Sequence, residues 1–457
     1  MKNTAKRSAF TGKIGFVLAA AGSAVGLGNI WRFPYLAAQY GGGIFLLIYI
    51  ALSVTFGFSL MVAEIAIGRK TGLSAIGAYR ALDKRFSFVG VLGALVPVII
   101  LPYYSVIGGW VMKYFAGLAS GHLGEMAANG GAYFGSYIGK TTEPLIWFLA
   151  FIGITALVVL FGVEKGVEKV SKVMMPALVV LILGITVYSL CTLDGAWQGV
   201  VYYIKPDFSK FSIMTVVAAM GQLFYSMSLA MGIMITFGSY MKKDISIEKS
   251  THQIEIFDTG IAFLSGLMIV PAVFAFSGGN EEVLSKSGPG LMFSVLPQVF
   301  DTMPGGAFIG AVFFIMVFFA ALTSSISLME TVVSIFHDKF KLNRRFCCLI
   351  VFGICLLLGI PSSLGYSAWS SFTLLGMQML DFFDFVSNSL IMPVVALATC
   401  IFVAFFLKPS AIVEEVELSG EFRWKKMFSA VIRYVAPVCI LVILISSILT
   451  ACGVIKI

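Results

Sequence analysis

The residues best suited to chemistry lie inside long apolar stretches of the sequence, where polar groups are costly. One run, 22–29, reads Gly-Ser-Ala-Val-Gly-Leu-Gly-Asn, and another, 222–232, reads Gln-Leu-Phe-Tyr-Ser-Met-Ser-Leu-Ala-Met-Gly. Both place weak helix formers and polar side chains in the middle of a hydrophobic segment. Backbone groups left unpaired at such a depth are tolerated only where they line a cavity or bind something. Asn29 and Arg32 support this interpretation, since such side chains inside a membrane are usually functional.

Other chemistries find little support in the sequence. There is no HExxH or GxSxG motif, and the nearest phosphate-loop candidate, 135–141, is one residue too short. The seven cysteines show no CxxC spacing, so we expect them to be packing residues without a metal or disulfide. An ion channel would need a repeated filter loop, which is not evident. We therefore expect a carrier and not an enzyme.

Simpler explanations exist for two of the motifs. A Gly22-xxx-Gly26 spacing is typical of close helix packing, and the hydroxyls of 323–325 could bond between helices. The presence of Asn29 and Arg32 beside the first motif favours a binding role over packing alone.

The elements that position these residues are predicted to be membrane spans. The 457 residues are 59% hydrophobic and only 12% charged, with a mean hydropathy of +0.97. A soluble protein of this length needs a more highly charged surface. About 20 apolar residues cross a bilayer, and eleven segments qualify: 14–36, 43–67, 88–118, 144–162, 172–191, 213–240, 254–277, 305–336, 347–368, 374–407 and 430–452.

The basic residues predict the orientation of these spans. The N-terminal tail and every second loop hold 24 of the 31 Lys and Arg residues, and the alternate loops and the C-terminus hold five. By the positive-inside rule the N-terminus is cytoplasmic, and an odd number of spans places the C-terminus outside the cytoplasm. Because the charge alternates by loop, the excess of +8 does not indicate a nucleic-acid partner. We expect a multi-pass protein of the plasma membrane, the inner membrane in a bacterium.

These motifs together resemble a known family. The run Ser23-Ala-Val-Gly-Leu-Gly-Asn-Ile-Trp-Arg-Phe-Pro34, followed by Gly41-Gly-Gly43, is similar to the first-span signature of the neurotransmitter:sodium symporter family. The similarity continues through Glu64 with Gly68-Arg69, Gln222–Ser228 and Ala320–Ser325, and covers about residues 7–407. It implies an all-α polytopic membrane protein with the LeuT-type fold, in which five plus five spans form inverted repeats and spans 1 and 6 are unwound. Residues 1–457 would then form one transporter domain, with spans 1–5 over about 14–191, spans 6–10 over about 213–407 and an extra span over 430–452.

The resemblance implies two sodium sites and no organic cofactor. The first would use the Ala24 carbonyl, Asn29, Ser226 and Asp258 together with the substrate carboxylate. The second would use the carbonyls of Gly22, Val25 and Ala320 and the hydroxyls of Thr323 and Ser324. Oxygen ligands suit a hard cation. The three histidines lie at span ends or in loops, which argues against a proton relay, although Glu64, Asp258 and Glu330 could titrate.

Asp258 also bears on chloride. By resemblance it stands where the bacterial leucine transporter has an asparagine, and Ala262 stands where that protein has a glutamate. A carboxylate near Tyr49, Gln222 and Ser226 could replace the bound chloride that some relatives need. We therefore expect chloride-independent transport.

The expected cargo is an amino acid. Relatives that transport amines have an Asp where this chain has Gly26, so the site offers backbone amides to a substrate carboxylate instead. Carbonyls of the two unwound segments and the Ser228 hydroxyl would meet the ammonium group. An apolar lining with some hydroxyls favours a large apolar or aromatic side chain. The predicted substrate site consists of Ser23, Ala24, Gly26, Leu27, Gly28, Ile100, Tyr104, Tyr225, Ser226, Ser228, Met231, Ser324 and Leu328.

Two gates are implied by the same resemblance. Outside the substrate site, Arg32 would pair with Asp384, with Asp381 as an alternative, above a lid of Tyr104 and Tyr225. On the cytoplasmic side, Arg7 would pair with Asp338, beside Phe10 and Tyr240. The alternative for Arg7 and Asp338 is that both are ordinary solvated loop charges.

The sequence thus predicts a secondary active transporter that couples inward sodium movement to amino-acid uptake by alternating access. Its partners would be the amino acid, sodium ions and the lipid bilayer. The alternatives are an amino-acid sensor of the same fold and a proton-coupled carrier. The sequence predicts no particular oligomeric state.

Overall fold

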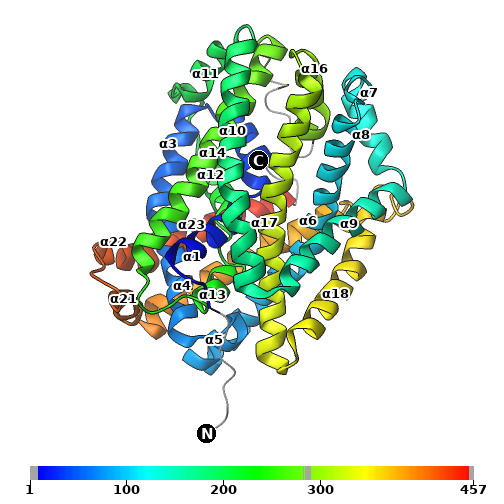
Figure 1. Ribbon diagram of the computed structural model, residues 1–457. Coiled ribbons are helices and arrows are strands. Elements are labelled where there is room, and N and C mark those ends of the chain that lie inside the picture. The colour runs from blue at the N-terminus through cyan, green and yellow to red at the C-terminus, as the bar shows by residue number, and fades with distance from the viewer. Residues whose placement is uncertain (1–8, 281–282, 284–289, 452–457) are drawn as a thin grey trace.

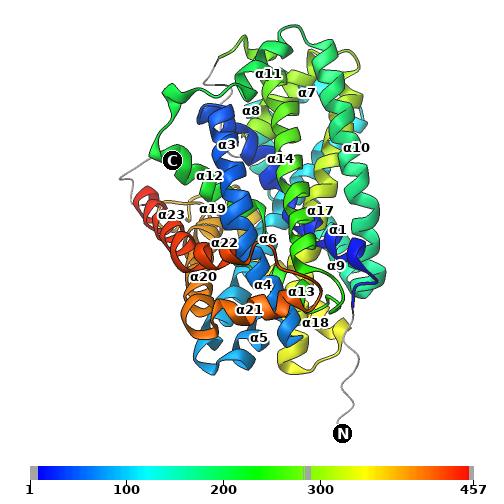
Figure 2. The same ribbon diagram turned by 90° about the vertical axis from the view of Figure 1, so that its left-hand side faces the viewer.

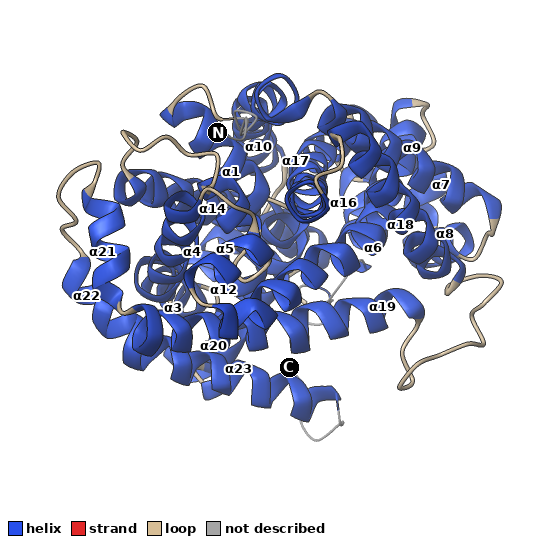
Figure 3. Cartoon of the chain, turned by 90° about the horizontal axis from the view of Figure 1, so that it is seen from below, coloured by secondary structure: helices blue, strands red, loops and turns tan. Residues whose placement is uncertain are grey.

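The computed structural model describes residues 9–280, 283 and 290–451, and these residues form helices joined by short loops (Figure 3). The α-helices are α1 (Lys13–Ala24), α2 (Phe33–Gln39), α3 (Gly43–Leu52), α4 (Phe58–Thr71), α5 (Ala75–Leu82), α6 (Ser87–Ala119), α7 (Leu123–Ala128), α8 (Gly130–Ile138), α9 (Thr142–Leu160), α10 (Lys169–Thr192), α11 (Ala196–Ile204), α12 (Ile213–Ser226), α13 (Ile233–Gly238), α14 (Ile247–Ser277), α16 (Leu296–Asp301), α17 (Gly306–Phe340), α18 (Arg344–Leu364), α19 (Met379–Asp384), α20 (Met392–Ile401), α21 (Pro409–Glu417), α22 (Lys425–Ala430) and α23 (Ala436–Ala451). Short π-helical segments join several of them: η1 (Gly28–Arg32), η2 (Ser53–Gly57), η4 (Val163–Glu168), η6 (Leu291–Val295), η7 (Phe385–Ile391), η8 (Phe402–Leu407) and η9 (Val431–Val435). The 3-10 segments are η3 (Lys84–Phe86) and η5 (Phe208–Lys210).

The predicted spans correspond to helices of the fold. Within the described ranges, nine continuous helical segments are long and apolar enough to cross a membrane, and α1 with the η1–α2 segment forms a further span bent by 55°. The sixth predicted span, 213–240, is divided into α12 and α13, each too short to cross alone. The eleven predicted segments therefore all appear, and an all-α membrane fold is confirmed.

Several span boundaries differ from the predicted ones, and the seventh span, for example, begins at Ile247 and not at 254. The fifth span begins at Val163 and not at 172, because the basic stretch 165–172 is helical. The ninth ends at Leu364 and not at 368, and the tenth begins at Met379 and not at 374. Residues between them form a turn with Leu375 and Gly376 at positive φ, which a helix cannot include.

Both predicted helix breaks are present at mid-span. In the first span, α1 ends at Ala24, the π-helical η1 begins at Gly28, and regular α-helix resumes at Phe33. In the sixth, residues 227–232 are non-helical, and Ser228 (φ 52°) and Ala230 (φ 60°) adopt left-handed backbone conformations. Such a conformation costs a non-glycine residue about 1–2 kcal/mol. One freed amide is satisfied at once, because Ala230 donates its backbone N–H to the buried Glu64 carboxylate at 2.7 Å.

The broken spans lie inside the bundle. Helix α1 packs against α10, α14 and α17, and the long helices α6 and α17 pack against each other. Figures 1 and 2 show α5 at one end of the molecule, the end from which the described chain begins, and the short helices α7 and α11 at the opposite end. We call these ends the N-terminal side and the far side. Small residues allow the close contacts: a Cβ added to Gly22 would lie 3.2 Å from Thr323 Cβ.

Candidate substrate and ion site

The two helix breaks and the facing helices enclose one cavity. Its volume is about 30 Å³, which is enough for water but too small for an amino acid. All thirteen residues of the predicted substrate site line it, together with Asn29 and Ile233. The unwound segments contribute backbone, while α6 contributes Ile100 and Tyr104 and α17 contributes Ser324 and Leu328. Tertiary packing therefore gathers four distant stretches of sequence around one space.

At one edge of this cavity lies a buried cluster around Asp258. The Asn29 Nδ2 atom donates to Ser226 Oγ at 2.9 Å and to Asp258 Oδ1 at 2.7 Å. Ser226 Oγ donates to the same carboxylate oxygen at 2.7 Å, and Tyr49 donates to Oδ2 at 3.2 Å. All four side chains are buried, with Asn29 and Asp258 fully so. The three side chains predicted for the first sodium site thus lie within hydrogen-bond distance of one another.

Gln222 forms its hydrogen bond with the backbone of the first span. The Nε2 atom of Gln222 donates to the Gly28 carbonyl at 3.0 Å and so satisfies a backbone acceptor next to the break in the first span. Of the three residues expected near Asp258, Tyr49 and Ser226 form hydrogen bonds with its carboxylate.

The five residues predicted for the second sodium site meet where the end of α1 touches α17. Ser324 Oγ lies 3.3 Å from the Gly22 carbonyl oxygen and 3.1 Å from that of Val25. Thr323 Oγ1 lies 3.1 Å from the Ala320 carbonyl oxygen. Carbonyl oxygens left free at a helix end are acceptors, and a cation bound among them would take the two hydroxyl oxygens as further ligands.

Backbone amides of the first break face the cavity but have partners. Leu27 N donates to the Tyr104 hydroxyl at 3.3 Å, and Gly26 N donates to Asn29 Oδ1 at 3.1 Å. A substrate carboxylate would take the place of the Tyr104 oxygen at Leu27. An alanine at 26 would crowd the cavity, because its Cβ would lie 2.8 Å from Ser324 Oγ and 2.9 Å from the Tyr104 hydroxyl, and these side chains would have to shift.

The opposite face of the cavity is closed by the two unwound segments themselves. Ser228 Oγ donates to the Ser23 carbonyl at 2.9 Å, and the two serine hydroxyls lie 3.2 Å apart. An ammonium group held here would meet carbonyl and hydroxyl oxygens and no competing cation.

On the far side, Arg32 and Asp384 line a second cavity of about 70 Å³ that Tyr225 also borders. Both residues belong to the described part of the chain, yet they do not form the predicted ion pair. The Arg32 guanidinium lies 5.5 Å above the Tyr225 ring, while Asp384 accepts from Tyr103 at 3.0 Å and from Asn388 at 2.7 Å. An ion pair between Arg32 and Asp384 would require their side chains to rotate within the cavity that both of them line.

The alternative residue, Asp381, lies outside this cavity. Its exposed carboxylate accepts from the Tyr366 hydroxyl at 3.3 Å. Burial raises the pKa of Tyr366 above its ordinary value, so the phenol keeps its proton and remains a donor. Asp384 is therefore the better placed of the two acids.

On the N-terminal side, Arg7 lies outside the described residues, so its pairing stays a prediction. Asp338 accepts the backbone N–H of Ser74 at 2.9 Å. The Phe10 side chain is fully buried and packs edge-on against Phe237 and Tyr240, and we call this cluster the Phe10 closure.

Sequence reasoning missed an ion pair beside this closure. Glu330 is fully buried on α17 and pairs with Arg344, which donates from Nη1 at 3.1 Å and also from Nη2. Tyr240 donates to the same carboxylate at 2.9 Å. The unusual position of Glu330 in an apolar helix was the available signal, but its partner is 14 residues away beyond a turn.

Comparison with known proteins agrees with this architecture. A model of the "Sodium:neurotransmitter symporter family" matches residues 7–124 and 136–454. The chain is 36% identical over 440 residues to an uncharacterized sodium-dependent transporter, YhdH, of Bacillus subtilis, covering 95% of this chain and 96% of that one. It is 32% identical to an uncharacterized sodium-dependent transporter of Haemophilus influenzae, covering 97% and 99%. Its structure is similar to the crystal structure of MhsT in complex with L-phenylalanine, with a TM-score of 0.87 and 36% identity over 97% of this chain and all of that one.

Proposed function

Since the chain belongs to the sodium:neurotransmitter symporter family and is a sodium-coupled membrane transporter, we propose that its cargo is an α-amino acid with a large apolar or aromatic side chain. One observation carries this proposal: thirteen residues from two unwound segments and two helices line one cavity that has Gly26, and no acid, at the first break. The similarity to MhsT, which was crystallised with L-phenylalanine, supports the aromatic preference.

The two ends of an amino acid fit the two polar edges of the cavity. The carboxylate would bind the Leu27 amide and the Tyr104 hydroxyl, which already face each other. The ammonium group would bind among the Ser23 carbonyl and the Ser228 hydroxyl. Ile100, Met231 and Leu328 would then surround the side chain. Because the cavity has a volume of only about 30 Å³, the lining side chains must move apart to admit the cargo.

Two sodium ions would bind beside the cargo. The first would bind between Asn29, Ser226 and Asp258, where the carboxylate provides a full negative charge. The Asn29 amide presently directs its nitrogen at the carboxylate, so sodium binding requires a half-turn that presents Oδ1. The second would bind among the carbonyls of α1 and the hydroxyls of α17.

The charge of Asp258 makes transport independent of chloride in this proposal. A fixed carboxylate beside the first sodium balances the ion's charge, and a bound anion would add a second, uncompensated one. Tyr49 and Ser226 orient the carboxylate, so its position does not depend on an added ion.

Transport would proceed by alternating access, with the N-terminal side in the cytoplasm. The basic loops support this orientation. The far-side cavity with Arg32 and Asp384 and the N-terminal closure around Phe10 would open in turn. The C-terminus would lie outside the cytoplasm.

Counterflow in proteoliposomes tests the proposal. Vesicles loaded with unlabelled L-phenylalanine should accumulate labelled L-phenylalanine when sodium is present and should fail to do so when choline replaces it. Replacement of chloride by gluconate should leave the rate unchanged. Sodium-dependent binding without counterflow would instead indicate a sensor, and accumulation driven by a pH gradient without sodium would indicate a proton-coupled carrier.

A further inference from the structure

A buried arginine at the N-terminal side has no role in the site described above. Arg69 lies in the last turn of α4, and its side chain is fully shielded from solvent. Its guanidinium contacts Glu415, whose side chain is only 4% exposed. A buried charge pair is maintained only where its geometry satisfies both partners, and removal of one partner is strongly destabilising.

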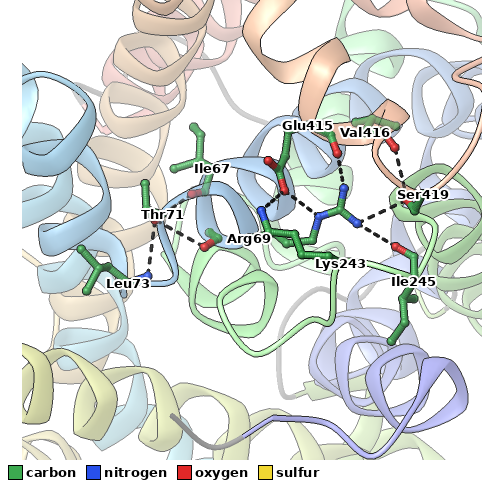
Figure 4. A network of polar contacts seen from close by, with 10 residues as sticks. Ile67, Arg69, Thr71, Leu73, Lys243, Ile245, Glu415, Val416 and Ser419 are labelled. Atoms are coloured by element: carbon green, nitrogen blue, oxygen red, sulfur yellow. Dashed lines mark hydrogen bonds and ion pairs between the residues drawn. The ribbon is translucent and has the colours of Figure 1, made fainter. Parts of the chain in front are cut away.

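Figure 4 shows how many partners Arg69 has. Nε donates to Glu415 Oε1 at 2.9 Å, and Nη2 donates to the backbone carbonyl of the same residue. Nη1 donates to the Ile245 carbonyl at 2.7 Å and to Ser419 Oγ at 3.4 Å. Lys243 Nζ adds a second cation to Glu415 Oε1 at 2.7 Å. The guanidinium is therefore fixed on three sides.

These partners belong to three segments distant in the sequence. Arg69 lies in the last turn of the second span. Lys243 and Ile245 lie in the loop between α13 and α14, and Glu415 lies on α21, between the tenth and eleventh spans. Helix α4 also touches α13 directly. The backbones are so close at Gly68 that an added Cβ would overlap the Ile235 carbonyl. The Arg69 contact thus joins α21 to the broken sixth span.

The same loop holds the segment that precedes the first span. Lys242 Nζ donates to the Thr11 carbonyl at 3.0 Å, and Phe10 N donates to the Tyr240 carbonyl at 3.2 Å. Lys242 and Lys243 are neighbours that reach to opposite sides, one to the N-terminal segment and one to α21. A displacement of α21 would reach the Phe10 closure through this loop.

We propose that Arg69 and Glu415 are positioning residues for transport: their contact couples α21 to the loop 239–246 and holds the N-terminal side closed, and its loss favours opening of that side. The eleventh span thereby influences the inner gate through its linker, although it lines no part of the substrate cavity. This inference rests on the proposed alternating access. Its test measures conformation and not cargo, so it can fail while counterflow succeeds.

Hydrogen exchange of the full-length protein in lipid nanodiscs with sodium tests the coupling. Glu415→Gln removes the charge that Arg69 and Lys243 share. The control, Glu417→Gln, removes a charge from the same helix where the acid pairs with Lys425 at 3.1 Å on the exposed surface. We expect amides in 239–246 and in 9–12 to exchange about tenfold faster in Glu415→Gln, which corresponds to about 1.4 kcal/mol of local stability. Glu417→Gln should leave both segments unchanged.

Faster exchange confined to 409–419 would overturn the proposal, because it would show only a local structural role for the pair. Equal effects of the two variants would overturn it as well. If Glu415→Gln does not remain monodisperse, Lys243→Met is used instead. This variant breaks the contact between Lys243 and Glu415, and hydrogen exchange is measured at residues 9–12. Unchanged exchange there would refute the coupling.

Discussion

Neutralisation of Asp258 tests the ion site most directly. Asp258→Asn keeps the shape of the side chain and one oxygen but removes the charge. The carboxylate is fully buried, and its Oδ1 atom lies 2.7 Å from both Asn29 Nδ2 and Ser226 Oγ. The hydroxyl of Ser226 can still donate to the amide oxygen, so we expect the cluster to remain assembled and the sodium affinity to fall.

The size of the loss follows from the charge and the distance. A cation bound within this cluster would lie about 3 Å from the carboxylate, where a unit charge contributes roughly 5 kcal/mol at an effective dielectric constant of about 20. Desolvation of the ion and the dipole of the remaining amide offset about half of this. A net loss of about 2–3 kcal/mol would raise the sodium concentration for half-maximal binding about 30- to 150-fold.

Sodium titration of labelled L-phenylalanine binding to the purified protein measures this shift. Asp381→Asn is the matched control, because it removes the same charge from an exposed residue outside the cavity. That variant should bind sodium like the wild type. A half-maximal sodium concentration within threefold of the wild type in Asp258→Asn would refute the view that this carboxylate binds the ion.

Three further variants probe the surrounding structure. Gly26→Ala places a Cβ 2.8 Å from Ser324 Oγ and should weaken L-phenylalanine binding at least about tenfold by overpacking, as equilibrium binding would show. Thr323→Val removes one proposed sodium ligand while keeping the shape, and should weaken sodium affinity about tenfold in the same titration. Glu64→Leu leaves the Ala230 amide unpaired in the membrane, and thermal unfolding should report a loss of about 1–3 kcal/mol.

The breaks in the first and sixth spans were predictable because their causes are local. A glycine-rich run and a stretch with two serines and a glycine form poor helix within apolar sequence, and the break follows wherever the chain lies in the bundle. The residues around the cavity were predictable only through family resemblance. Ile100 and Leu328 are apolar residues in apolar helices, and their types alone do not distinguish a cavity lining from lipid contact or core packing.

Polar pairings between distant segments were the least predictable feature. The partner of Arg32 was expected to be Asp384, yet the two share a cavity without forming an ion pair. Glu330 finds Arg344, and Arg69 finds Glu415 more than 340 residues later. A lone charge in an apolar helix indicates that a partner must exist, but several acids lie in the loops on the same side.

The sequence by itself determined that this protein is a membrane bundle with two interrupted spans, because hydropathy and helix propensity act over short distances. Tertiary structure alone decided which polar groups meet. The helices must first pack before Asn29, Ser226 and Asp258 lie within 3 Å of one another. The Arg69 contact depends in the same way on how α21 folds back against α4, since a buried charge is stabilised only by the neighbours that packing brings to it.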